Sequence, residues 1–263
     1  MKILLVGSNF SYAIERYFVR YLTEMGVTIE HFAAQDMVLE FCSKNIVNKI
    51  LFHSKIYTGY TAVNKILLET AEAFNPDIVW IFKGMEIFPK TIQQLKIEGI
   101  KTVNFNGDHP FIFSGRGSGN KNVSESFPLY DAHFTYMDSL KKVIENNYHI
   151  QSFLLPFGYE LSDSLYETCN FKETKPYACF IGNPDEIRVS FIRELISAKI
   201  PIDLYGHSWN KYIEMNELCT IYEPVYGEAF WKTVRQYRIQ LNIFRKHNAV
   251  SYTHLTLPTK RIV

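Results

Sequence analysis

The stretch Lys2-Ile3-Leu4-Leu5-Val6-Gly7 decides the fold class. It is a short, continuous apolar run that ends at a glycine, which is typical of a parallel strand buried on both faces. A segment with helical periodicity follows from Tyr12 to Met25 and is closed by Gly26. A strand followed by a helix is the repeating unit of α/β proteins, so this stretch predicts a mostly parallel sheet.

The same alternation continues along the chain. It predicts strands at 27–32, 77–82, 101–105, 132–136 and 152–155, and helices at 64–74, 89–98 and 138–146. A second series has strands at 177–181, 202–205 and 239–244, with helices at 185–198 and 228–237. Turn-forming and charged residues interrupt the pattern between the two series, as at a domain boundary. We therefore predict two Rossmann-like, doubly wound domains at 1–156 and 177–249, with a linker at 157–176.

Composition narrows the class of protein. The chain has 263 residues, 47% of them hydrophobic, and a net charge of +1. This balance predicts a globular fold and gives no electrostatic reason to expect a nucleic-acid partner. No run of about 18 apolar residues occurs, and the N-terminal apolar run is too short for a signal peptide, so we expect no integral membrane segment and a cytoplasmic location.

The cysteines and glycines argue against several kinds of cofactor site. The four cysteines are far apart with no C-x-x-C pair, so we expect neither a metal site nor a disulfide framework. The first turn holds one glycine, Gly7, where a dinucleotide fingerprint needs three. In the glycine-rich loop at 115–119, Asn120 stands where a P-loop needs its second glycine before Lys121. This loop is either a flexible connection or a mobile lid that brings Arg116 and Lys121 near an anionic ligand.

Candidate site residues lie just after the predicted strands, because open α/β sheets bind ligands outside the carboxyl ends of their strands. These segments are Gly7-Ser8-Asn9, Lys83-Gly84, Asn106-Gly107-Asp108-His109-Pro110, Gly182-Asn183 and Gly206-His207-Ser208-Trp209. An Asp beside a His can orient the imidazole or act as a base itself, which makes Asp108 and His109 candidate catalytic residues. In the alternative reading, Asp108 caps a turn and His109 fills space.

In the second series, the candidates suit an anionic ligand. Gly182 and Asn183 stand between a strand and a helix, where backbone N–H groups and the helix N-terminus can face a phosphate, although simple turn chemistry looks the same. Arg245 follows a strand and is either a partner for a diphosphate or a solvated charge. Trp209 is either a stacking face for a base or a core residue.

Three motifs resemble a known family in their order and spacing. They are Cys179-Phe180-Ile181-Gly182-Asn183, Leu204-Tyr205-Gly206-His207-Ser208-Trp209 and Tyr237-Arg238-Ile239-Gln240-Leu241-Asn242-Ile243-Phe244-Arg245. The chain resembles the CgeB-like (spore-maturation type) glycosyltransferases, a bacterial family with the GT-B fold. The segment from Asn104 to Pro110 is also similar to a strand end in the first domain of that family.

The resemblance implies a nucleotide-sugar donor held mainly by the second domain, an acceptor on the first, and no required metal or other cofactor. The implied donor-binding residues are Gly182, Asn183, Gly206, Trp209, Asn242 and Arg245. Asp108 or His109 would carry the acceptor-side chemistry, with Ser8, Asn9, Arg116 and Lys121 on the acceptor side or its loop. The expected function is transfer of a sugar to an unidentified acceptor. A non-catalytic protein that binds a nucleotide sugar or another small ligand is the alternative.

The pattern of the family breaks after Arg245. Members continue with a segment like Asn-x-Arg-x-Phe-Glu, whereas this chain reads Val-Ser-Tyr-Thr-His-Leu-Thr-Leu-Pro-Thr at 250–259. That run resembles a translated sequencing adapter. We therefore expect 250–263 to be a non-native tail, the second domain to be incomplete, and the chain to be an inactive fragment of a glycosyltransferase.

Overall fold

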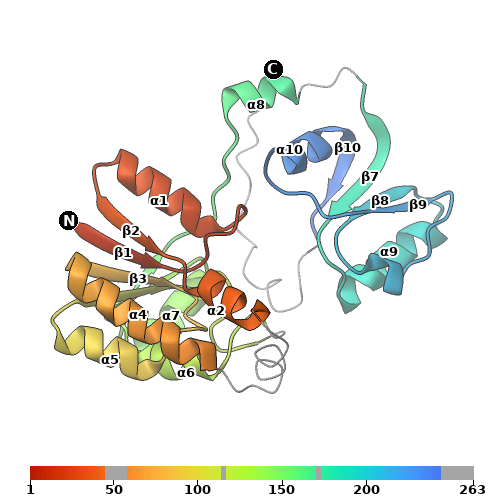
Figure 1. Cartoon of the computed structure of the whole chain (residues 1–263). Coiled ribbons are helices and arrows are strands. Elements are labelled where there is room, and N and C mark those ends of the chain that lie inside the picture. Colours follow the sequence, from red (N-terminus) through yellow and green to blue (C-terminus); the bar gives the residue numbers. More distant parts are fainter. Residues whose placement is uncertain (45–57, 114–116, 170–172, 244–263) are drawn as a thin grey trace. The chain divides into compact units, whose positions relative to one another are not determined.

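The structure is a computed structural model and describes residues 1–44, 58–113, 117–169 and 173–243. Contacts between residues divide the chain into unit 1, Met1–Phe157, and unit 2, which begins at Gly158. Each unit is built on a parallel sheet with helices packed on it (Figure 1). The predicted α/β class with two Rossmann-like domains is confirmed. The expected tail at 250–263 lies outside the described residues.

Unit 1 contains a parallel sheet in the order β2-β1-β3-β4-β5-β6. Its strands are β1 (Lys2–Val6), β2 (Thr28–Phe32), β3 (Ile78–Phe82), β4 (Lys101–Phe105), β5 (Ala132–Thr135) and β6 (Gln151–Leu154). Its helices are α1 (Ile14–Glu24), α2 (Ala34–Ser43), α4 (Thr58–Phe74), α5 (Pro89–Ile97), α6 (Lys121–Ser126) and α7 (Asp138–Tyr148), with a 3-10 turn, η1 (Phe127–Leu129). The chain adds β2 on one side of β1 and β3 on the other, so the topological switch point lies between β1 and β3.

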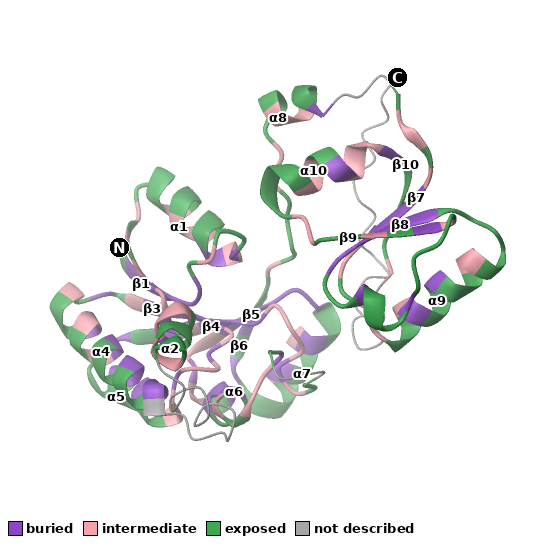
Figure 2. Ribbon diagram, turned by 45° about the vertical axis from the view of Figure 1, so that its right-hand side comes forward, coloured by how far each residue is buried: buried purple, intermediate pink, exposed green. Residues whose placement is uncertain are grey.

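Alternate side chains of β1 enter two different cores. Leu4 and Val6 pack in one cluster with residues of α2, α4 and α5. Ile3 and Leu5 pack in a second cluster with residues of α1. Because both faces of the strand are covered, the apolar run is continuous rather than alternating, and the strand is buried over its length after Lys2 (Figure 2).

Unit 2 contains a parallel sheet in the order β10-β7-β8-β9. Its strands are β7 (Lys175–Ile181), β8 (Ile202–Tyr205), β9 (Cys219–Tyr222) and β10 (Tyr237–Leu241). Its helices are α8 (Asp163–Thr168), α9 (Glu186–Ser197) and α10 (Gly227–Arg235), with a 3-10 turn, η2 (Trp209–Lys211). The chain adds β8 and β9 on one side of β7 and β10 on the other, so the switch point here lies between β7 and β10.

Some elements differ from the sequence-based expectation. The stretch expected to be a linker contains α8, whose first turn is capped by the Ser162 hydroxyl accepting from the Leu165 N–H at 3.2 Å. β10 begins at Tyr237, earlier than predicted, because Tyr237 is a buried residue of the sheet. Helix α2 and strand β9 were not expected. Among the described residues, no helix combines the length and apolarity needed to cross a membrane.

Candidate functional site

A cavity of about 570 Å³ lies at the carboxyl ends of β1, β3 and β4 in unit 1, and we call it the unit 1 cavity. It stands at the switch point of the sheet, where open α/β folds bind their ligands. Its ionisable and hydroxyl side chains include Ser8, Glu15, Lys83, Glu86 and Asp108, and its rings are those of Phe10, Tyr12, Tyr60, Phe82, Phe105 and Phe157. Of the candidate segments predicted from the sequence, the structure brings Gly7, Ser8, Lys83, Gly107 and Asp108 to this cavity.

Lys83 and Asp108 form an ion pair at the wall of the cavity. The Lys83 Nζ lies 2.6 Å from the Asp108 Oδ2 and donates to the carbonyl of Gly117 at 2.6 Å. The backbone of Lys83 and Gly84 is left-handed, with φ of 59° and 88°. A left-handed lysine costs about 1 kcal/mol, and such residues cluster at functional sites. The buried Asn104 supports this turn by donating from its Nδ2 to the carbonyl of Ile81 at 2.9 Å.

The turn between β1 and α1 is already bonded to carboxylates of this chain. The Ser8 N–H donates to the Glu15 Oε1 at 3.0 Å, and the Asn9 N–H donates to the Asp36 Oδ2 at 2.8 Å. Gly7 admits Glu15 here, because a Cβ at that position would lie 2.5 Å from the Glu15 Oε1. A Rossmann turn typically offers its N–H groups to a phosphate. In unit 1 a phosphate would meet two carboxylates instead.

Burial raises the pKa of two of the cavity carboxylates. The pKa of Glu15 is raised by burial, against the opposing effect of the Ser8 N–H. Burial raises the pKa of Glu86 to about 7, although its own backbone N–H and the charge of Lys83 act in the other direction. A carboxyl group that titrates near neutral pH suits general acid–base chemistry. Glu86 therefore has the proton affinity of a catalytic base or acid.

The other predicted residues of unit 1 are placed elsewhere. Among the described residues, His109, Asn9 and Lys121 are not part of the lining of the cavity. The His109 Nδ1 accepts from the Phe111 N–H at 3.2 Å, so the ring packs against its own loop. Lys121 begins α6, is mostly exposed and lies 3.4 Å from the Glu125 carboxylate. Arg116 lies outside the described residues.

In unit 2, the turns after β7 and β8 are locked together. A Cβ at Gly206 would lie 2.3 Å from the Gly182 carbonyl oxygen, so the two backbones need glycine in order to approach. The Asn183 Oδ1 accepts from the His207 N–H at 2.9 Å. Trp209 is fully buried, and its Nε1 donates to the Gly182 carbonyl at 2.7 Å. Trp209 thus supports the turn from the core, and the base-stacking role does not fit a ring with 0% exposure.

Arg188 joins the ends of β7 and β10. Its Nε donates to the carbonyl of Ile243 at 2.9 Å, and its Nη1 donates to the carbonyl of Asn183 at 2.9 Å. The exposed Asn242 lies next to this link, at the switch point of the sheet. The predicted residues Gly182, Asn183 and Asn242 therefore belong to one end of the unit 2 sheet. Arg245 lies outside the described residues.

Glu15, Glu86 and Arg188 were not predicted as site residues. Glu86 lies two residues after the strand end Lys83-Gly84. That strand end was itself predicted as a candidate site segment, and its position is the sequence signal that could have pointed to Glu86. Glu15 and Arg188 belong to helices, where a charged residue is normally interpreted as part of the solvent-exposed face. Among the described residues, no group of three or more His, Cys, Asp or Glu side chains is placed to hold a metal ion.

Comparison with protein-family models and with curated protein sequences gives no match. Comparison with solved structures does. A UDP-GlcNAc 2-epimerase from Neisseria meningitidis bound to UDP-GlcNAc has a TM-score of 0.59 at 11% identity, over 91% of this chain and 77% of that chain. The UDP-GlcNAc 2-epimerase from Methanocaldococcus jannaschii has a TM-score of 0.55 at 12% identity, over 91% and 78%.

A trehalose-6-phosphate synthase, studied for glycosyl transfer with retention, has a TM-score of 0.56 at 12% identity, over 91% of this chain and 77% of that chain. At identities this low, the similarity establishes the fold alone. The chain shares with these enzymes the GT-B fold class, in which two Rossmann-like α/β domains follow one another along the sequence.

Proposed function

We propose that this chain is part of a CgeB-like glycosyltransferase, which transfers the sugar of a nucleotide-diphosphate sugar to a hydroxyl group of an acceptor; that the chain by itself is an inactive fragment stays a prediction. The observation that carries the proposal is the unit 1 cavity, which places carboxylates and aromatic rings at the switch point of a Rossmann-like sheet. The fold shared with nucleotide-sugar epimerases and a glycosyl-transferring synthase supports it.

The two units take different substrates in this proposal. The β1–α1 turn of unit 1 is bonded to Glu15 and Asp36, which leaves that unit a poor place for a diphosphate. We therefore assign the donor to the ends of β7, β8 and β10 in unit 2, with Gly182, Asn183, Gly206, Asn242 and Arg245 as the donor-side residues. The acceptor is assigned to the unit 1 cavity.

Nucleotide-sugar binding by the whole chain tests the donor assignment. We expect UDP-glucose, GDP-mannose or another common nucleotide sugar to bind in calorimetry, and Asn183→Ala or Asn242→Ala to weaken that binding about tenfold, the effect of one lost hydrogen bond. Asn146→Ala is the matched control, because Asn146 is an exposed residue of α7 in unit 1. Equal affinity in all four proteins would refute the assignment of the donor to unit 2.

Product analysis distinguishes the candidate activities. Release of the nucleoside diphosphate with a new glycoside supports transfer. Conversion of the nucleotide sugar into its epimer would instead favour an isomerase, a second candidate because two of the similar structures are epimerases. Binding with no product would favour the non-catalytic alternative. The cytoplasmic location and the CgeB-like membership stay predictions.

A further inference from the structure

We propose that the unit 1 cavity takes an uncharged, hydroxyl-bearing acceptor of the sugar or polyol class, and that Glu86 removes the proton from its reacting hydroxyl. This inference rests on the proposed glycosyl transfer and adds to it the chemical class of the acceptor and the base. It also replaces Asp108 and His109 as the residues expected to carry the acceptor-side chemistry.

The charges of the cavity exclude an anionic acceptor. Three carboxylates, those of Glu15, Glu86 and Asp108, line it together with one cation, Lys83. The cation is already paired with Asp108 at 2.6 Å, so it has little charge left to offer a phosphate or a carboxylate of a ligand. Like charges placed together in a partly buried site are strongly unfavourable. An acceptor that carries a phosphate is therefore discriminated against.

The shape and the remaining side chains suit a sugar. A volume of about 570 Å³ is within the range of small-molecule sites and holds a ligand of one or two sugar rings. Carboxylates accept hydrogen bonds from hydroxyl groups, and the rings of Phe10 and Tyr12 give apolar faces for the C–H side of a pyranose.

Glu86 is better placed than Asp108 to act as the base. The Asp108 carboxylate is occupied by the Lys83 ammonium group at 2.6 Å and is therefore less free to contact the hydroxyl group of an acceptor. No side chain among the described residues donates a hydrogen bond to the Glu86 carboxylate, and its own backbone N–H is the local group that stabilises its charge. The charged groups that act on it are Lys83 from the same loop, Glu15 from α1 and Asp36 from α2.

The proposed step balances in atoms and charge. The acceptor O–H bond breaks and its proton goes to the Glu86 carboxylate. The acceptor oxygen forms a bond to the anomeric carbon of the donor sugar, while the bond from that carbon to the diphosphate oxygen breaks. The nucleoside diphosphate leaves with the electron pair. Glu86 then returns its proton to water before the next turnover.

Ligand binding tests the acceptor class. Saturation-transfer NMR on the whole chain compares 4-nitrophenyl β-glucoside, β-galactoside, α-mannoside and N-acetyl-β-glucosaminide with the 6-phosphate of the glucoside. We expect at least one neutral glycoside to bind and the 6-phosphate to bind at least tenfold more weakly. Leu39→Trp, at an exposed residue of the lining, should block binding, whereas Leu154→Trp, at an exposed residue outside it, should not.

Kinetics test the base. With the nucleotide sugar and glycoside that react, Glu86→Gln should lower kcat about 100-fold or more, which is the usual contribution of a general base. The KM for the donor should stay within twofold, the rise of rate between pH 6 and 8 should disappear, and Glu86→Asp should restore part of the activity. Glu69→Gln, an exposed carboxylate of α4, should behave as the wild type.

The outcomes separate this inference from the proposed function. Glycoside 6-phosphates that bind as tightly as the neutral glycosides would overturn the acceptor class, and so would nucleotide-sugar binding without binding of any neutral glycoside. A Glu86→Gln protein with wild-type rate and pH profile would overturn the base. A chain that neither binds nor consumes a nucleotide sugar would refute the proposed function, while the glycoside experiment would still decide the chemistry of the cavity.

Discussion

Two carboxylates, those of the buried Glu15 and the partly buried Glu86, give the unit 1 cavity its character at the scale of single residues. Each has a raised pKa because burial disfavours the charged form. Holding such groups costs folding free energy at neutral pH, since an ionised side chain would be better solvated in the unfolded chain. Residues that reduce stability in this way are often retained for function.

Glu86 should make the stability of the protein depend on pH in a definite direction. Its pKa in the folded chain is about 7. In the unfolded chain a glutamate titrates at about 4.3, so the folded state binds more protons between these values. Its favourable contribution is present below the unfolded pKa and is lost as the pH rises through 7. Glu86→Gln should therefore be more stable than wild type at pH 8, by about 1–3 kcal/mol, and much less so at pH 5.

Urea denaturation of both proteins at the two pH values measures this difference. Glu69→Gln is the control, because an exposed carboxylate should give no pH-dependent gap. An Glu86→Gln protein that is equally destabilised at both pH values would show that the side chain contributes packing rather than a buried charge.

The sequence predicted those site residues that directly follow strands. Ser8 and Asp108 reach the cavity because the carboxyl ends of parallel strands share one edge of the sheet. Glu86 was not singled out although it follows the recognised strand end Lys83-Gly84, because the left-handed backbone at Lys83, which a lysine rarely adopts, is not visible in a sequence pattern. His109 packs against its own loop and Trp209 lies in the core, which are the alternatives that the sequence left open, because adjacency in sequence does not fix which way a side chain points.

At the scale of elements, continuous apolar runs predicted the strands more reliably than turn residues predicted where the elements begin and end. The runs that became β1 and β3 are apolar over four or more consecutive residues and buried on both faces, so they can be recognised without an alternating pattern. β9 is four residues long and exposes Thr220 and Tyr222, so its hydrophobic signal is weak. Helix α2 begins without a side-chain cap, which removes the usual start signal.

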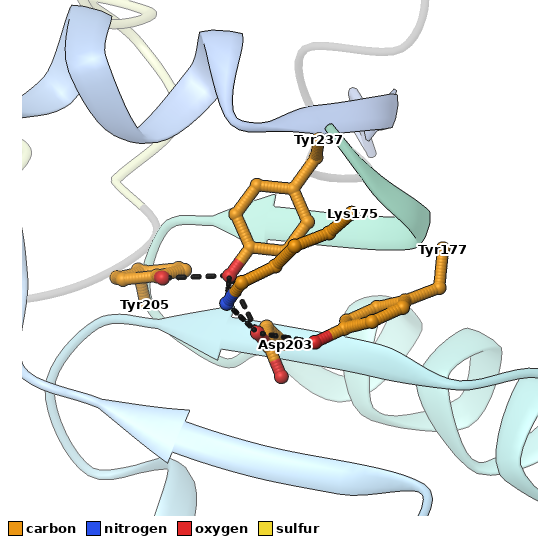
Figure 3. A network of polar contacts seen from close by, with 5 residues as sticks. All are labelled: Lys175, Tyr177, Asp203, Tyr205 and Tyr237. Carbon is orange, nitrogen blue, oxygen red and sulfur yellow. Dashed lines mark hydrogen bonds and ion pairs between the residues drawn. The ribbon is translucent and has the colours of Figure 1, made fainter. Parts of the chain in front are cut away.

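A polar network joins three strands of unit 2 on the face opposite to the α9 cluster (Figure 3). The carboxylate of Asp203 is almost fully buried and accepts from the Lys175 Nζ at 3.0 Å and from the Tyr237 hydroxyl at 2.5 Å. Tyr205 and Tyr237 are joined through their hydroxyl oxygens at 2.7 Å. The Lys175 ammonium also lies 4.7 Å from the centre of the Tyr237 ring. The network thereby ties β10 to β7 and β8.

Removing the Lys175 ammonium group should show how much this network contributes to the free energy of unfolding of unit 2. Lys175→Met leaves the Asp203 charge buried without its counter-ion, and we expect a loss of about 1–3 kcal/mol, below the full value for a buried pair because Lys175 is partly exposed. Lys65→Met, which breaks an exposed pair with Glu69, should cost less than about 0.5 kcal/mol. Chemical denaturation of the two variants compares these values.

The stability difference between wild type and Lys175→Met should decrease at high pH. Interaction with Asp203 raises the pKa of Lys175 against the opposing effect of burial, which is the largest single influence, and burial together with Asp203 raises that of Tyr237. The folded state therefore holds its protons to higher pH than the unfolded state, so this stabilisation is complete below about pH 10 and declines above it. The difference between wild type and Lys175→Met should shrink as the pH rises above about 10. A constant difference would contradict the ion-pair account.

At the scale of the whole molecule, each unit has its own sheet and its own hydrophobic clusters. We expect scanning calorimetry to resolve two unfolding transitions rather than one. A nucleotide sugar at ten times its Kd should raise one of them by roughly 5 °C and leave the other in place, because binding stabilises only the unit that holds the ligand. A common shift of both transitions would contradict the assignment of the donor to one unit.

The carboxylates that occupy the β1–α1 turn of unit 1 also set the stoichiometry of nucleotide binding. Two units of the same general fold would ordinarily offer two phosphate-binding turns of similar design. In unit 1, the N–H groups of this turn are already hydrogen-bonded to the carboxylates of Glu15 and Asp36, which therefore compete with any phosphate for the turn. The two units therefore share a fold but differ in their ability to bind a phosphate. Each polypeptide should bind one nucleotide, not two.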